Sequence, residues 1–251
     1  MRATAHPGRR NEIGWKRATY IEEASELEVT PGIHLLESLR FANCYLIAGD
    51  ELTLIDTGLP RNAGKVLTYI AERLQRRRSD LTTIVLTHHH FDHTGSAAEL
   101  RRLTNAKIAV HSDEIDYVTG AKTQAMHKGL TGMLFKAASP FFKAAPIQPD
   151  IILGDGDAVA GLTVLHTPGH TPGSISLHDP GRRTLFVGDA IRYINGRILG
   201  PSEDFTMDMQ QARRSIGKIA QLDFDVMLGG HGEPLTSQAA VRIRELSDLW
   251  R

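Results

Sequence analysis

The stretch that decides the fold reads Thr87-His88-His89-His90-Phe91-Asp92-His93. It follows the apolar, β-branched segment 82–86 and precedes Gly95, so its side chains are expected on a loop at the end of a strand. Histidines at 88, 90 and 93 together with an aspartate at 92 would arise by chance in roughly 2 of a thousand chains of this composition. The stretch is therefore a candidate metal site.

The spacing within this stretch separates its side chains into groups. His88 and His90 are two residues apart, so an extended backbone points both to the same side, where they can share one metal ion. His89 points the other way and is expected not to bind metal. Asp92 and His93 lie beyond a turn and can face a second ion. Imidazole and carboxylate donors suit zinc, manganese or iron rather than calcium.

Further donors must come from elsewhere, because one metal ion takes three or four protein ligands. Three later residues stand at predicted strand ends beside glycine: His170, Asp189 and His231. Asp56 precedes Thr57-Gly58, and spacing alone makes orientation of a ligand and simple turn capping equally good interpretations. His111 and His166 end predicted strands and are weaker candidates for orienting a ligand.

Composition excludes several classes of protein. The chain has 251 residues, with 29 basic and 29 acidic side chains, and this zero net charge argues against broad phosphate binding to nucleic acid and against a polybasic membrane surface. No apolar stretch reaches the length of a membrane span. The single cysteine, Cys44, excludes an internal disulfide, and no secretory signal follows the N-terminal arginines, so a cytoplasmic location is expected.

Hydrophobic periodicity predicts an α/β protein of one domain over residues 1–251. Each half of the chain runs through strands, a helix and another strand, which indicates sheets in the middle and helices outside. Strands are expected at 43–48, 52–55, 82–86, 107–110, 151–153, 163–166, 175–177, 184–187 and 226–228, and helices at 62–78, 95–103, 208–222 and 237–250.

The segment 120–149 interrupts this regular series. It carries methionine and phenylalanine side chains, Phe141 among them, at loosely helical spacing. Three roles fit such a segment: an ordinary pair of core helices, a homodimer contact, or a lid over a pocket. As a lid it would bury an apolar acyl group of the substrate, and Phe141 would then contact that group.

The ordered motifs resemble those of the metallo-β-lactamase-fold superfamily over nearly the whole chain. The resemblance implies an αββα sandwich of two mixed β-sheets with outer helices and two divalent metal ions, zinc in the first place and iron or manganese as alternatives. It implies that His88, His90 and His170 bind the first ion and that Asp92, His93 and His231 bind the second. Asp189 would bridge both ions, and Asp56 would orient ligands from behind.

The same resemblance implies a reaction. A hydroxide bridging two metals would attack an ester, thioester or lactone carbonyl in a small-molecule substrate, with Asp92 and Asp189 as the catalytic carboxylates. Asp92 is also the nearest candidate to pass a proton to the leaving group. The alternative is an oxidoreductase similar to the persulfide dioxygenases, which use one iron.

Differences between this sequence and the patterns of individual subfamilies narrow the range of possible reactions. Lactamases usually place Cys or Ser where this chain has Asp189, and only 20 residues follow His231, where glyoxalase II enzymes add a helical region. The nucleases of the family carry large insertions, and the flavodiiron members carry a flavodoxin domain. Lactonases place a tyrosine shortly after the bridging aspartate, and Tyr193, four residues after Asp189, is a candidate substrate residue.

Overall fold

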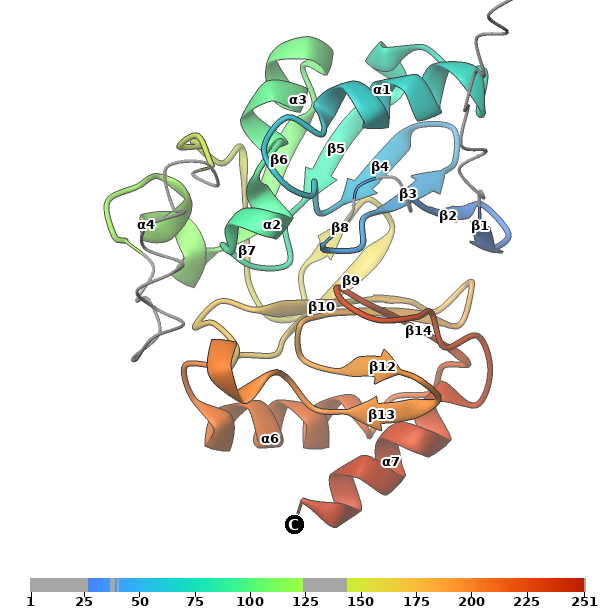
Figure 1. Ribbon diagram of the computed structural model, residues 1–251, viewed down its shortest axis with the longest axis vertical. Coiled ribbons are helices and arrows are strands. Elements are labelled where there is room, and N and C mark those ends of the chain that lie inside the picture. The colour runs from blue at the N-terminus through green and yellow to red at the C-terminus, as the bar shows by residue number, and fades with distance from the viewer. Residues whose placement is uncertain (1–26, 37–38, 40, 124–143, 251) are drawn as a thin grey trace, which may run out of the picture.

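A computed structural model describes residues 27–36, 39, 41–123 and 144–250, in which two β-sheets pack face to face between outer helices (Figure 1). The first sheet is mixed. Neighbouring strands are antiparallel in its first half and parallel in its second half, and the fourth strand belongs to both. Its strands, in spatial order, are β1 (Leu27–Thr30), β2 (Ile33–Leu35), β3 (Tyr45–Ala48), β4 (Leu52–Ile55), β5 (Leu81–Val85), β6 (Lys107–His111) and β7 (Ile151–Leu153).

The second sheet is also mixed. Its strands, in spatial order, are β14 (Val226–Gly229), β11 (Thr184–Gly188), β10 (Ile175–Asp179), β9 (Leu162–His166) and β8 (Ala158–Val159). β14 and β11 are parallel and the other neighbours antiparallel. A separate hairpin joins β12 (Arg192–Ile194) to β13 (Arg197–Leu199).

Helices cover the outer face of each sheet (Figure 1). Over the first sheet lie α1 (Ala63–Glu72) and α3 (Ala97–Thr104), and over the second lie α6 (Met209–Ile219) and α7 (Ala239–Leu249). Two short helices, α2 (Phe91–Thr94) and α4 (Ile115–Val118), follow β5 and β6, and short 3-10 turns occupy 78–80, 112–114 and 203–205.

Strand alternation explains the layers, since neighbouring side chains of a strand point to opposite faces. In β4, Leu54 packs under α1 and α3 while Ile55 lies in the core between the sheets. In β11, Phe186 lies in that same core, and its neighbours Leu185 and Val187 pack against α6 and α7. These strands carry apolar side chains on both faces, so each sheet is covered by the other sheet on one face and by helices on the other. The expected αββα sandwich is confirmed.

Two details differ from the expectation. The helix predicted over 62–78 ends at Glu72, and Gln75 has a left-handed φ of 53° that a continuing helix excludes. Arg76 instead pairs with Asp80 at 2.8 Å and donates to the carbonyl oxygens of residues 49 and 50. The hairpin of β12 and β13 was not predicted, although Asn195 and Gly196, both with positive φ, form the turn type that Asn-Gly favours.

Most of the segment 120–149 lies outside the described residues, including Phe141, so its role as lid, dimer contact or core stays a prediction. Its described end, residues 144–149, leads into β7 of the first sheet, and the Ile147 N–H donates to the carbonyl oxygen of Val118 in α4 at 2.8 Å. None of the helices in the described part of the chain is long and apolar enough to cross a membrane.

Candidate metal centre

The candidate donor residues all follow strand ends and meet at one edge of the two sheets. After β5 the chain continues through Thr87 and His88 into α2, which carries Asp92 and His93. His170 lies in the turn between β9 and β10, Asp189 directly follows β11, and His231 lies two residues after β14. Because β4 and β5 are parallel, as are β11 and β14, the carboxyl ends of each pair meet at the same edge.

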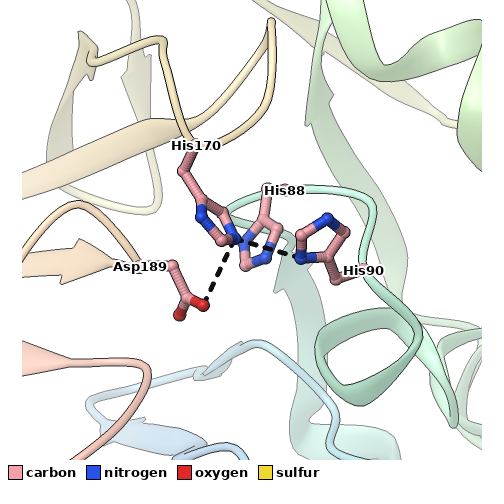
Figure 2. Close-up of side chains that lie close together, drawn as sticks. All are labelled: His88, His90, His170 and Asp189. Atoms are coloured by element: carbon pink, nitrogen blue, oxygen red, sulfur yellow. Dashed lines mark hydrogen bonds and ion pairs between the residues drawn. The ribbon is translucent and has the colours of Figure 1, made fainter. Parts of the chain in front are cut away.

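One group of donors contains His88, His90, His170 and Asp189, whose donor atoms lie within 4.8 Å of one another (Figure 2). The His170 Nε2 atom lies 3.0 Å from the His90 Nδ1 atom and 3.3 Å from the Asp189 Oδ2 atom. Figure 2 shows the three imidazoles converging from two loops, with the carboxylate of Asp189 approaching from a third. The prediction that His88 and His90 face one point agrees with this placement.

A second group contains Asp92, His93 and His231, again with donor atoms within 4.8 Å of one another. The His231 Nε2 atom lies 3.5 Å from the Asp92 Oδ2 atom, and the His93 Nε2 atom lies 3.9 Å from it. Asp189 connects the two groups, because its Oδ1 atom lies 3.3 Å from the His93 Nε2 atom and its Oδ2 atom 3.3 Å from the His231 Nε2 atom.

Several buried polar atoms at this centre lack a hydrogen-bond partner among the described residues. They are His88 Nε2, His93 Nε2 and Asp189 Oδ1. A buried nitrogen or oxygen without a partner is costly, so such atoms are rare unless they serve a bound group. Imidazole nitrogens and a carboxylate oxygen are good donors for zinc, iron or manganese. The residues present therefore fit divalent metal ions.

Asp56 contacts the second group through the Nδ1 atom of His93, whereas the Nε2 atom of that ring faces the other donors. Its Oδ2 atom lies 2.8 Å from the His93 Nδ1 atom, and its two oxygens accept hydrogen bonds from the backbone N–H and the hydroxyl of Thr87. The Thr87 hydroxyl also lies 3.0 Å from the Nδ1 atom of His88. Asp56 is buried and has a left-handed φ of 59°, a conformation that aspartate tolerates better than most residues. Of the two interpretations of Asp56, the geometry favours orientation of a donor.

Two outer partners were not predicted. The His170 Nδ1 atom lies 3.2 Å from the Thr206 hydroxyl, and the His231 Nδ1 atom lies 2.9 Å from the Phe41 carbonyl oxygen. Thr206 is 36 residues from its partner in the chain, and nothing in its local sequence indicates the contact. Phe41 contributes a backbone oxygen, so no side-chain pattern could have identified it.

Burial and neighbouring charges set the protonation of the donors. Burial lowers the pKa of His88, His90 and His170, and the neighbouring imidazoles of the centre add to this effect. Burial also acts to lower the pKa of His93, but the carboxylates of Asp189, Asp56 and Asp92 outweigh it, and the pKa is raised. The same opposition lowers the pKa of Asp189, where three imidazoles outweigh burial. His88, His90 and His170 therefore favour the neutral imidazole that binds metal, whereas His93 and His231, whose pKa is also raised, release a proton when an ion binds.

The remaining candidates have other contacts. His89 turns away from the donors, as predicted, and its ring stacks on that of Tyr117 with centroids 4.1 Å apart. Tyr193 packs against the buried residues between the second sheet and helices α6 and α7, with its ring 4.8 Å from the guanidinium of Arg242 in α7. Its backbone pairs with Gly232, the residue after His231, and its contact with a substrate stays a prediction.

His111 and His166 form a third group with Asp113, in which donor atoms again lie within 4.8 Å. Their rings stack with centroids 4.0 Å apart. The His166 Nε2 atom lies 2.9 Å from the Pro172 carbonyl oxygen, and the His111 Nδ1 atom accepts from the Asp113 N–H. These nitrogens are already engaged, so the group connects the ends of β6 and β9 rather than adding donors to the centre.

Comparison with known proteins agrees with this geometry. A solved structure described as a metallo-beta-lactamase family protein from Thermus thermophilus superposes with a TM-score of 0.67 at 28% identity, covering 88% of this chain and 79% of that one. The probable metallo-hydrolase YflN of Bacillus subtilis is 32% identical over 88% of this chain and 91% of its own length.

A second relative carries a more specific name. The human acyl-coenzyme A thioesterase MBLAC2 is 34% identical over 62% of this chain and 60% of its own length, so the match spans less than two thirds of that protein. The model of the metallo-beta-lactamase superfamily matches residues 38–231, which include every donor of both groups. The chain therefore belongs to the metallo-beta-lactamase superfamily.

Proposed function

We propose that this metal-dependent hydrolase binds two divalent ions, zinc in the first place, and hydrolyses the thioester bond of a small molecule with an apolar acyl group. In this proposal His88, His90 and His170 bind one ion, and Asp92, His93 and His231 bind the other. Asp189 binds both. Esters and lactones share the same carbonyl chemistry and are the nearest competing substrates.

The placement of Asp189 carries the proposal. One of its carboxylate oxygens lies 3.3 Å from the His93 Nε2 atom, and the other lies 3.3 Å from the His170 Nε2 atom. A single carboxylate thus reaches a donor in each group, which is the arrangement expected of a residue shared by two ions. A site for one ion would give no role to the second group, Asp92, His93 and His231, whose donor atoms also lie within 4.8 Å of one another.

The outer contacts prepare the donors for this role. The carboxylate of Asp56 and the carbonyl oxygen of Phe41 accept from the Nδ1 atoms of His93 and His231, which places the ring proton on Nδ1 and leaves the Nε2 lone pair facing the centre. Ions bound there would polarise a carbonyl group and lower the pKa of a water molecule toward 7.

Asp92 is the residue best placed to move a proton. Its side chain is 16% exposed, against 0% for the neighbouring His93, so one carboxylate can both face the donors and reach a leaving group. A thiol leaving group has a pKa near 8.5 and needs less help from a proton donor than an alcohol does. Thioesters are accordingly the least demanding of the three substrate classes.

The proposed substrate class is supported by MBLAC2, whose name specifies an acyl-coenzyme A thioesterase. The test is a panel of acyl thioesters, acyl esters and lactones with acyl chains of two to ten carbons, assayed on protein whose metal content has been measured. About two zinc ions per chain and hydrolysis of the thioesters would support the proposal. One iron per chain with oxygen consumption on a persulfide would replace it with the dioxygenase alternative.

The same panel tests whether Phe141 contacts the acyl group. Each buried methylene contributes about 0.8 kcal/mol, so two further carbons should raise kcat/KM roughly tenfold. We expect Phe141→Ala to flatten this dependence. The control is Leu249→Ala, which removes an apolar side chain that is 83% exposed at the end of α7. A flat profile on the unmodified protein would contradict the acyl-binding role.

A further inference from the structure

Glu114 is a fully buried carboxylate that connects two loops of the metal centre. It ends the 3-10 turn after β6, and its side chain is 0% exposed. Its Oε2 atom bonds the Nδ1 atom of His89, between His88 and His90. Its Oε1 atom accepts from the Thr171 hydroxyl at 2.7 Å and from the Gly173 N–H at 2.6 Å, just after His170.

The ring of His89 is also held by a stacking contact. Tyr117 of α4 stacks on the imidazole with an interplanar angle of 7°, and the side chain of His89 is 3% exposed. Because a carboxylate can only accept here, the Nδ1 atom of His89 donates to Glu114, and this bond fixes the orientation of the ring. The pair therefore fixes the backbone between two metal donors.

The contact with the second loop is equally close. A Cβ atom at Gly173 would lie 2.6 Å from the Glu114 Cγ atom, so only glycine lets this loop approach the carboxylate. The Thr171 hydroxyl bonds both Glu114 and the hydroxyl of Ser174, each at 2.7 Å. Burial acts to raise the pKa of Glu114, but the hydrogen bonds from His89, Thr171 and Gly173 outweigh it and lower the pKa.

We propose that Glu114 is a positioning residue that sets the distance between His90 and His170 by bonding His89 in one loop and Thr171 and Gly173 in the other. The His90 Nδ1 and His170 Nε2 atoms lie 3.0 Å apart, yet they come from loops of different sheets. Glu114 bonds the residue immediately before one donor and the residue immediately after the other. This inference rests on the proposed assignment of both histidines to the first metal ion.

Glu114→Gln is the sharpest variant, because it keeps the shape of the side chain. Its amide oxygen can still accept from Thr171 and Gly173, but its amide N–H₂ faces the Nδ1 atom of His89. The imidazole must then move its proton to the buried Nε2 atom or turn away, and either change shifts the loop of His90. Thr171→Val removes one bond at the opposite end of the same connection, and Thr171→Ser restores it.

The experiment measures binding of cobalt(II) to metal-free protein by its visible absorption, in competition with a chelator. We expect Glu114→Gln and Thr171→Val each to lower the affinity for the first cobalt ion roughly tenfold and to shift its absorption band. Thr171→Ser should restore both. The double variant should lose less than the sum of the two single losses, because both changes interrupt one connection. Glu99→Gln, which makes the same chemical change on the exposed face of α3, is the matched control.

Unchanged cobalt affinity and spectrum in Glu114→Gln and Thr171→Val would overturn the positioning role. A lower unfolding midpoint with an unchanged spectrum would also overturn it, since that result describes a purely structural residue. If Glu114→Gln does not fold, Thr171→Val decides alone. An unmodified protein that binds no cobalt would instead refute the proposed metal assignment, so the two failures are distinguishable.

Discussion

Asp189 is the residue on which both donor groups depend. Its carboxylate is buried among the imidazoles of His93, His170 and His231, and these outweigh burial to keep its pKa well below the usual range. The negative charge is therefore retained at neutral and mildly acidic pH. This one carboxylate lies against donors of both groups, so the loss of its charge should be felt by both.

Asp189→Asn keeps the size of the side chain and removes that charge. We expect metal content to fall for both ions and hydrolysis to drop by about 100-fold or more, with the fold retained. Metal analysis after dialysis against a weak chelator checks the first point, and thioester hydrolysis checks the second. Asp50→Asn, in the exposed turn between β3 and β4, should change neither. Two tightly held ions in the Asp189 variant would refute the shared role.

At the level of elements, the position of the short helix α2 depends on the absence of a side chain at Gly95. Gly95 ends α2 with a φ of −55°, which any residue can adopt, so its backbone angle does not require glycine. The space does: a Cβ atom there would collide with the Pro60 nitrogen and lie 2.5 Å from the Leu59 carbonyl carbon. α2 carries Asp92 and His93, so this close approach fixes two donors at once.

Gly95→Ala should therefore destabilise the protein by about 1–3 kcal/mol, the usual cost of overpacking, and weaken binding of the second metal ion. Gly64→Ala in α1 is the matched control, because nothing lies within 4 Å of the added carbon. Its alanine should stabilise the helix by about 0.5 kcal/mol. Urea unfolding of the metal-free proteins measures both effects. Equal stabilities for the two variants would contradict the steric argument.

Much of the fold was predictable because the central strands of the two sheets are apolar and the four longer helices each have one apolar stripe. The donor residues were predictable because they follow strand ends. What spacing could not reveal were contacts between distant segments. Thr206 bonds His170 through a hydroxyl that no motif identifies, and Glu114 stands in an ordinary polar turn. The end of α1 was wrong because Arg76 leaves the helix to bond Asp80 and the β3–β4 turn, a tertiary effect that overrides helix propensity.

For the whole molecule, the two sheets meet at a pair of stacked histidines as well as at the metal centre. His111 ends β6 of the first sheet and His166 ends β9 of the second. Burial and then the His166 ring lower the pKa of His111, while the carboxylates of Asp113, Glu114 and Asp155 act in the opposite direction. The folded protein therefore favours the neutral imidazole at this junction.

The lowered pKa of His111 makes the folded protein less stable at acidic pH. The neutral form contributes fully above the unfolded pKa of about 6.5, and stability is lost as the pH falls toward the lower folded pKa, because the unfolded chain binds the extra proton. His111→Asn keeps an acceptor for the Asp113 N–H and cannot titrate. Urea midpoints at pH 7.5 and 5 should fall less in the variant than in the unmodified protein. Identical falls would show that His111 does not contribute to the acid sensitivity.

The division of donors between the sheets has a consequence for folding kinetics. His88, His90 and His93 follow a strand of the first sheet, whereas His170, Asp189 and His231 follow strands of the second. Neither sheet alone carries a complete set, and the donor contacts that join the two sets span up to 139 residues, from Asp92 to His231. Such long-range pairing forms late in folding. In a refolding experiment with cobalt(II) present, the visible absorption band should thus appear only once the two sheets have docked. The rate at which the band rises then measures the rate of docking.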